Sequence, residues 1–193
     1  MEEIEIRGKI SKKDFERLNK LLSEQGKLIK HYHRLSIDLS PGFDPRTRTW
    51  PKDDLVDLRI KKTDRQEKIT VKVGDFNAQK REELEINLAE GQLVEALKMF
   101  AALGFSQGMV YFGQNWEYEY RGFEVKLVQY ANDYFNWEIE SHQPDLDPNA
   151  LAEKLNLHPF LKEEYKKEIN WQNQNLHQLY SLKIVEKILQ ENF

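Results

Sequence analysis

The chain has 193 residues, no cysteine and a formal net charge of -4, from 29 basic and 33 acidic residues. A chain of this length can bury a sizeable core, so we expect a single domain over residues 1–193. The absence of cysteine excludes disulfides and thiolate metal sites, and a slightly acidic chain does not fit a nucleic-acid-binding protein. We find no apolar run that would span a membrane and no secretory signal, so a cytoplasmic protein is expected.

The first predicted strand, residues 2–10, alternates charged and aliphatic side chains. A strand turns successive side chains to opposite faces, so Glu3, Glu5 and Arg7 share one face and the two isoleucines between them share the other. Two carboxylates on one strand face repel each other unless water, a cation or bases lie opposite them. The stretch is therefore either an exposed strand face over a core or part of a charged site.

A helix is predicted over residues 11–26, and a second strand over residues 28–39. His31 and His33 fall on one face of that strand, a spacing that can ligate a metal. No third ligand is near in the sequence, so ordinary strand residues are the favoured interpretation. The polar segment 40–53 contains two prolines and predicts a long loop, which would be mobile or would cover a site.

Three strands with the same alternation follow, and each has an aliphatic face and a charged face. They are predicted over residues 57–62, 67–73 and 80–88. Their charged faces carry Arg59 and Lys61 in the first, Lys72 in the second, and Arg81, Glu83 and Glu85 in the third.

The second half of the chain predicts a helix, then four strands, then more helices. The helix covers about 91–103, and the strands cover 105–113, 115–121, 123–130 and 134–141. The last strand places Glu138 and Glu140 on one face. Helices are expected at about 148–155, 159–168 and 173–191, and the final one is amphipathic.

The recurring charged strand faces have two interpretations, which the alternation alone leaves open. In one, the aliphatic faces pack a core and the charges meet water, as in a one-sided antiparallel sheet. In the other, the sheet closes into a barrel with the charges in its lumen and the aliphatic faces beneath helices. Such a lumen suits a polyphosphate, because bases bind its oxygens and carboxylates hold the divalent cations that bridge them.

The stretch from Glu3 to Arg7 resembles the N-terminal Glu-x-Glu-x-Lys signature of the CYTH superfamily, the triphosphate tunnel metalloenzymes. Further motifs resemble those of the superfamily in its order: Leu58-Arg59-Ile60-Lys61, Thr70-Val71-Lys72, Arg81-Glu82-Glu83-Leu84-Glu85, Leu103-Gly104-Phe105 and Trp137-Glu138-Ile139-Glu140. The resemblance covers about residues 2–170. It implies an α+β fold, an eight-stranded antiparallel β-barrel or tunnel with surrounding helices, in which residues of about 148–191 form C-terminal helices.

The resemblance also implies roles for individual residues. The metal ligands for Mg²⁺ or Mn²⁺ would be Glu3, Glu5, Glu138 and Glu140. The triphosphate would be bound by Arg7, Arg59, Lys61, Lys72 and Arg81, with Glu83 and Glu85 in support. The residues most directly involved in catalysis would be Glu3, Glu5 and Lys72.

Two departures from the family pattern threaten turnover. The family usually carries a basic-x-Arg pair on the strand after Leu-Gly-Phe, whereas residues 113–115 read Gly-Gln-Asn. It also usually carries an acidic metal ligand near Val128 and Gln129, where this chain has none, although Asp133 is close in sequence. Loss of a preorganised charge typically costs ~10²-fold or more in rate.

Aromatic residues surround the first of these departures. Tyr111, Trp116 and Tyr118 offer surface on which a base or another ring could stack, but ordinary strand packing is the favoured interpretation.

The sequence therefore predicts a metal-dependent hydrolase of a triphosphate-containing small molecule: inorganic tripolyphosphate, a nucleoside triphosphate or thiamine triphosphate. The alternatives are a polyphosphate- or nucleotide-binding protein that is weakly active or inactive, and an enzyme like class IV adenylyl cyclase. Neither nucleic acid nor membrane is an expected partner, and both a monomer and a homodimer remain open. The amphipathic helix near 173–191 would close one tunnel mouth, which is the preferred role, or form a dimer face.

Overall fold

The computed structural model describes residues 4–51, 56–73, 82–131, 133–141, 143 and 145–193. The chain forms two compact units, each built from two separate stretches of sequence. Unit 1 comprises residues 1–32 and 113–169, and unit 2 comprises residues 33–112 and 170–193. The prediction of one domain over the whole chain stays a prediction, and the two units are described one at a time below.

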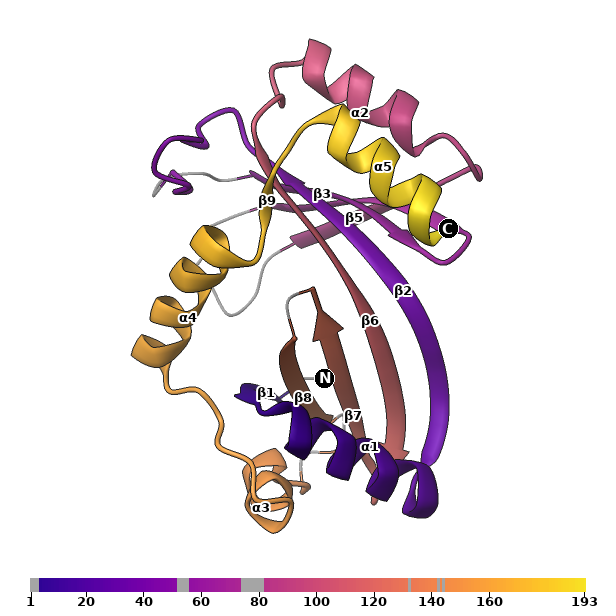
Figure 1. Cartoon of the computed structure of the whole chain (residues 1–193), viewed down its shortest axis with the longest axis vertical. Helices are drawn as coiled ribbons and strands as arrows, with labels where there is room; N and C mark the ends of the chain where they lie inside the picture. The colour runs from indigo at the N-terminus through magenta and orange to yellow at the C-terminus, as the bar shows by residue number, and fades with distance from the viewer. Residues whose placement is uncertain (1–3, 52–55, 74–81, 132, 142, 144) are drawn as a thin grey trace. The chain divides into compact units, whose positions relative to one another are not determined.

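Long antiparallel strands dominate the described residues (Figure 1). Their bounds are β1 Ile4–Ile10, β2 Lys27–Leu39, β3 Val56–Thr63, β4 Gln66–Val73, β5 Glu82–Leu88, β6 Gly108–Tyr120, β7 Phe123–Tyr130, β8 Tyr134–Ser141 and the short β9 Gln178–Leu179. The pairing order is β1-β8-β7-β6-β2-β3-β4-β5, and β9 pairs with β6. Within the described residues, β1 and β5 end this order and no pair joins them.

The helices are α1 Lys12–Gln25, α2 Leu93–Ala102, α3 Pro148–Lys154, α4 Lys162–Asn175 and α5 Leu182–Asn192. The hydroxyl of Ser11 accepts a hydrogen bond from the backbone N–H of Asp14 at 3.1 Å, so it caps α1 in the usual way. None of the described helices is long and apolar enough to cross a membrane. The predicted α+β class, with eight long antiparallel strands and helices around them, is confirmed.

Two boundaries differ from the prediction. Residues 105–121 were expected to form two strands, but β6 is continuous, because Gly113 and Asn115 pair with Tyr130 and Val128 of β7. Gly113 suits this place, since a Cβ there would lie 2.9 Å from the carbonyl oxygen of Gln129. The helix expected at 173–191 is divided into the end of α4, strand β9 and α5.

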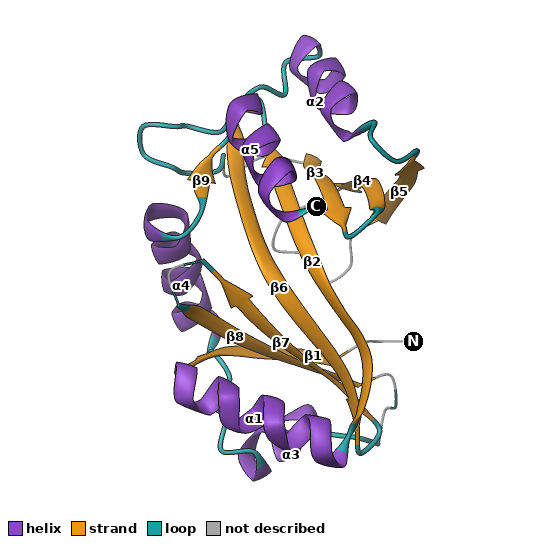
Figure 2. Ribbon diagram, turned by 45° about the vertical axis from the view of Figure 1, so that its right-hand side comes forward, coloured by secondary structure: helices purple, strands orange, loops and turns teal. Residues whose placement is uncertain are grey.

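Unit 1 buries the aliphatic and aromatic faces of its strands against α1 and α3 (Figure 2). Leu18 and Leu22 of α1 are fully buried, as is Trp137 of β8. Gly8 of β1 lies opposite Trp137, where a Cβ would come within 2.8 Å of the indole nitrogen. The helical spacing of apolar residues in α1 therefore fixes which face of these strands is covered.

Unit 2 uses α2 and α5 in the same way. Leu35 and Ile60 of the strands pack in one cluster with Leu97 of α2 and with Val185 and Ile188 of α5. The apolar face of α5 is thus buried on the aliphatic side of its own unit. The apolar residues Val185 and Ile188 therefore serve the core of this unit, and the two roles expected of the final helix, closing a tunnel mouth or forming a dimer face, stay predictions.

A buried ion pair lies on the aliphatic side of unit 2. Lys62 and Glu67 are buried neighbours across the β3–β4 pair, and their Nζ and Oε1 atoms are 2.9 Å apart. The other carboxylate oxygen of Glu67 accepts a hydrogen bond from the backbone N–H of Leu93 at 2.7 Å. Glu67 therefore joins the β3–β4 hairpin to the first residue of α2.

We expect Glu67→Ala to lower the free energy of unfolding by ~3–5 kcal/mol, because it leaves the ammonium of Lys62 buried without its partner. Urea unfolding followed by circular dichroism measures the change. Glu95→Ala is the matched control on α2, where an exposed carboxylate pairs with Lys98, and it should leave the unfolding midpoint unchanged. Equal effects of the two substitutions would contradict a structural role for Glu67.

Candidate functional site

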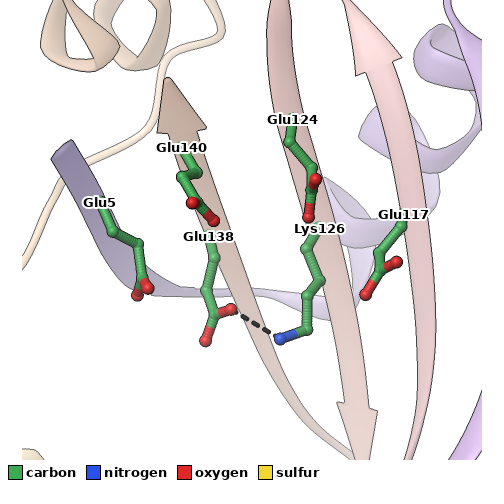
Figure 3. A pocket seen from close by; sticks show the side chains of 6 residues that line it. All are labelled: Glu5, Glu117, Glu124, Lys126, Glu138 and Glu140. Carbon is green, nitrogen blue, oxygen red and sulfur yellow. Dashed lines mark hydrogen bonds and ion pairs between the residues drawn. The ribbon is translucent and has the colours of Figure 1, made fainter. Parts of the chain in front are cut away.

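Four strands of unit 1 bring charged side chains side by side on the face opposite α1 and α3 (Figure 3). The register places four carboxylates next to one another across β1, β8, β7 and β6, and we call Glu5, Glu140, Glu124 and Glu119 the acidic row. The neighbouring mixed row consists of Arg7, Glu138, Lys126 and Glu117 on the same strands. Alternation along each strand produces both rows, because residues two apart share a face.

A pocket of about 140 Å³ opens between these side chains. It is lined by Glu5, Glu117, Glu124, Lys126, Glu138 and Glu140, which are five carboxylates and one ammonium group. The Nζ of Lys126 lies 2.7 Å from Oε2 of Glu138, and Figure 3 shows this contact inside the pocket. A lining with this excess of negative charge favours a cationic ligand, since carboxylates on neighbouring strands repel each other.

Arg7 lies beside the pocket and contacts three groups. Its guanidinium donates to the carboxylate of Glu5 and, at 3.0 Å, to the hydroxyl of Tyr165, and it lies 3.7 Å from Glu138. Burial alone would lower the pKa of Arg7, but the nearby carboxylates of Glu138 and Glu5 raise it above its ordinary value. Arg7 therefore stays a cation and holds two of the predicted metal ligands.

The donor atoms of this pocket suit a divalent cation. Carboxylate oxygens are the ligands that Mg²⁺ and Mn²⁺ prefer, and the pocket supplies them without sulfur or imidazole. In the arrangement described, no three acidic or histidine side chains of the described residues converge closely enough to hold a metal ion. The chemistry of the set fits the expected cation, while Glu138 is engaged by Lys126 and Arg7.

Unit 2 carries most of the bases on its own charged face. Register pairs align Asp38 with Arg59, Lys61 with Lys68, and Asp57 with Lys72 and then Glu83. Lys72 lies 2.9 Å from Glu83, and Lys68 lies 2.6 Å from Glu85. These pairs partly neutralise the bases and fix where their charges lie.

Arg59 is held between two carboxylates. Its Nε and Nη2 atoms donate to Asp57 at 2.9 and 2.7 Å, and Nε is 3.9 Å from Asp38. Burial would lower the pKa of Arg59, but Asp38 and Asp57 raise it above the ordinary value. Burial raises the pKa of Asp38, and Arg59 opposes that shift. The guanidinium is therefore charged and rigidly oriented.

Lys61 differs from the other bases of this face. Within the described residues its ammonium makes no hydrogen bond and no ion pair, and its side chain is half-buried. Burial, then the neighbouring charges of Arg59 and Arg34, lower the pKa of Lys61 below its ordinary value. A partly buried cation among other cations gains stability when an anion binds beside it.

The predicted site residues fall into two groups. Unit 1 brings together Glu5, Arg7, Glu138 and Glu140, and unit 2 aligns Arg59, Lys61, Lys72, Glu83 and Glu85 on one face. Glu3 and Arg81 lie outside the described residues. Asp133, considered as a replacement for the missing acidic ligand, lies in the β7–β8 turn with a 72% exposed side chain near Lys12 and does not line the pocket.

Sequence reasoning missed three side chains of the pocket: Glu117, Glu124 and Lys126. The signal was present, because Glu117-Tyr-Glu119 and Glu124-Val-Lys126 alternate charge with apolar residues just as the first strand does. Their strands were read as aromatic instead. Asp38 and Lys68 of unit 2 were missed in the same way.

Most of the aromatic and histidine side chains singled out in the sequence take part in ordinary strand packing, which was the favoured interpretation. Trp116 and Tyr118 belong to the core of unit 1, and His31 stacks on Trp116 with ring centroids 4.6 Å apart. His33 stacks on Phe112 at 5.8 Å. Tyr111 of β6 is different, because it lies on the charged face of unit 2.

Comparison with known proteins comes from structure alone, since no family model and no curated protein matches the chain. A "putative adenylate cyclase" from Bacillus halodurans is 15% identical, with a TM-score of 0.61, over 87% of this chain and 98% of its own. A conserved hypothetical protein from Pyrococcus furiosus is 20% identical, with a TM-score of 0.60, over 84% of this chain and 93% of its own.

A third similar structure is a "putative adenylyl cyclase" from Hippeastrum, described as having a dominant triphosphatase activity. It is 17% identical, with a TM-score of 0.55, over 81% of this chain and 89% of its own. The chain has the CYTH-type fold. At these identities the similarity establishes the CYTH fold, and the chemistry must be argued from the residues of this chain.

A half-buried histidine adjoins the charged face of unit 2. His177 stacks on Tyr111 with centroids 4.7 Å apart, and the hydroxyl of Tyr111 donates to Asp38 at 3.2 Å. Nδ1 of His177 lies 3.0 Å from Oδ1 of Asn173, and the tautomer that is protonated at Nδ1 donates a hydrogen bond to this oxygen. Burial lowers the pKa of His177 from 6.5 to about 4.

The lowered pKa of His177 predicts that the free energy of unfolding decreases as the pH falls. Because the folded-state pKa of His177 lies below the unfolded value, the unfolded chain takes up the proton first as pH falls. The contribution is fully present above about pH 6.5 and is lost toward pH 4, by about 2–3 kcal/mol. Urea unfolding at pH 7 and 4.5 should show a smaller pH-dependent loss for His177→Gln than for wild type. His158→Gln, at an exposed position, should keep the wild-type loss, and identical losses in all three proteins would refute the assignment.

Proposed function

We propose that the chain is a metal-dependent hydrolase of a triphosphate-containing small molecule. The observation that carries this proposal is Lys61, a half-buried lysine without a carboxylate partner in the described part of the chain, aligned with Arg59 and Lys68 on one strand face. Such a cluster favours a ligand with several negative charges. The triphosphatase activity described for the similar Hippeastrum protein supports the same class of substrate.

The bases of unit 2 would bind the phosphate oxygens. Arg59 presents a guanidinium whose orientation is fixed by Asp57, and Lys61 and Lys72 add two ammonium groups, of which that of Lys72 pairs with Glu83. Arg7 and Arg81 were predicted for the same role; Arg7 belongs to unit 1, and Arg81 lies outside the described residues. Charge neutralisation by these bases would favour the transition state, in which negative charge is spread over the transferred phosphoryl group.

The carboxylates of unit 1 would hold Mg²⁺ or Mn²⁺. Glu5, Glu138 and Glu140 were predicted for this role together with Glu3, and the pocket adds Glu124. When bound, a divalent cation neutralises charge on phosphate oxygens and polarises the phosphoryl group toward attack by water. Lys126 and Arg7 hold Glu138 in place, while Glu83 and Glu85 hold the bases Lys72 and Lys68.

A second candidate is a protein that binds the same ligands without turnover. It is favoured by three positions on the charged face of unit 1 that carry no charge: Gly113, Asn115 and Val128. Gly113 and Asn115 are the residues where the family pattern has its basic-x-Arg pair, and Val128 lies where that pattern has an acid. A binding protein would retain affinity for tripolyphosphate and release no phosphate.

Phosphate release from tripolyphosphate, ATP, GTP and thiamine triphosphate, with Mg²⁺ or Mn²⁺, tests the proposal. We expect metal-dependent release that falls ~10²-fold or more in Lys61→Met and in the double variant Glu5→Gln, Glu140→Gln, because each removes preorganised charge. Glu95→Gln, on the exposed side of α2, should retain wild-type activity.

The other outcomes each assign a different function. Formation of cyclic AMP from ATP would replace the hydrolase with a cyclase. No product, together with a tripolyphosphate-dependent rise in melting temperature that Lys61→Met abolishes, would establish the binding protein. Neither turnover nor stabilisation would overturn both candidates.

A further inference from the structure

Lys9 is a base on the charged face of unit 1 to which neither the proposed function nor the family pattern gives a role. It follows Glu5 and Arg7 at every second residue of β1, so it shares their face. The residues aligned with it across β8, β7 and β6 are uncharged: Asn136, Val128 and Asn115. Lys9 therefore supplies the charge of this third row of the described strands.

The amide opposite Lys9 is incompletely satisfied. Oδ1 of Asn136 is buried and has no hydrogen-bond partner among the described residues. A side-chain amide presents an oxygen on one side and an NH₂ donor on the other, and turning it over exchanges them. An anion bound at Lys9 would therefore find an amide able to donate to it directly across the strand pair.

A side chain of α4 now acts as the counter-ion of Lys9. Oε1 of Glu168 lies 3.7 Å from Nζ of Lys9 and accepts a hydrogen bond from the hydroxyl of Tyr134 at 2.6 Å. One turn earlier on the same helix face, the hydroxyl of Tyr165 accepts from Arg7 at 3.0 Å. Side chains from the first half of α4 thus contact two successive basic residues of β1, Arg7 and Lys9.

This half of the helix has little apolar anchorage. Between residues 162 and 169 only Tyr165, Glu168 and Ile169 are half-buried, and the others are exposed. The buried residues of α4, Gln172 and Asn173, belong to its second half. Polar contacts with the charged face therefore hold the first half in place, and segments of this kind open at low cost.

We propose that Lys9 is a further anion-binding residue and that Glu168 is its built-in competitor, which a phosphate group displaces. The proposal rests on the proposed function only in taking a phosphate anion as the ligand. A phosphate carries more charge than one carboxylate and more acceptor oxygens, so it competes well against a Glu168 contact that is longer than a hydrogen bond. Displacing Glu168 would also release α4 from Lys9.

Calorimetric titration with inorganic tripolyphosphate in the absence of divalent cations tests this directly. We expect Glu168→Gln to lower the Kd about 3- to 10-fold, because the competitor loses its charge, and Lys9→Met to raise it about 10-fold. In the double variant the gain from Glu168→Gln should disappear, since there is no ammonium left to compete for. Lys9→Arg should restore binding.

Glu163→Gln is the matched control, because Glu163 lies on the same helix half and pairs with Lys166 rather than with a base of β1. It should leave the Kd unchanged. Weaker binding by Glu168→Gln, wild-type binding by Lys9→Met, or no binding by the wild-type protein would each overturn the inference.

Turnover with Mg²⁺ separates this inference from the hydrolase proposal. The expected Kd changes without phosphate release would leave Lys9 and Glu168 in their roles and overturn the hydrolase. Phosphate release without the Kd changes would do the reverse.

Discussion

Burial of aliphatic strand side chains beneath helices is the constraint on which the rest of the structure depends, and β5, whose Leu84 and Ile86 are exposed, is the exception among the long strands. In unit 1 the covering helices are α1 and α3, and in unit 2 they are α2 and α5. Because strand side chains alternate, covering one face commits the intervening residues to the other. Charged residues from separate parts of the sequence are thereby forced into neighbouring positions, whatever their mutual repulsion.

The chain distributes these charges unevenly between its two units. The pocket of unit 1 has five carboxylates and one ammonium group, whereas the charged face of unit 2 aligns Arg59, Lys61, Lys68 and Lys72. Each unit also contains the groups that restrain its charges, such as Lys126 beside Glu138 and Asp57 beside Arg59. The charged groups of each unit are therefore held by ion pairs with neighbours of the same unit.

The alternation along the strands of Glu5, Arg7 and Glu138 is a local property, so the sequence was sufficient to place these residues on the charged strand faces and to predict the α+β class. It was insufficient where partners decide the outcome. The sequence predicted two strands, 105–113 and 115–121, whereas the pairing of Gly113 and Asn115 with β7 makes β6 one continuous strand. The amphipathic pattern of α5 was correct, but its burial against Leu97 depends on contacts between distant segments.

The candidate site shows the same limit. Glu124 and Lys126 carry the alternating pattern, yet their proximity to Glu140 and Glu138 follows from the β7–β8 register. This register cannot be deduced from the alternation within either strand. The contact between Glu168 and Lys9 was also beyond the sequence, because it joins a helix to a strand more than 150 positions earlier and no local pattern marks it.

The acidic row has a consequence for how this protein would evolve. Four adjacent carboxylates raise the energy of the ligand-free fold, because like charges placed directly opposite on paired strands are destabilising. Random substitutions of Glu124 or Glu140 by neutral residues would therefore stabilise the ligand-free fold while they remove carboxylates from the proposed cation site. Selection for stability alone would replace the carboxylates of the acidic row with neutral residues. If the acidic row is kept in related proteins, this would indicate selection for binding of the proposed cation.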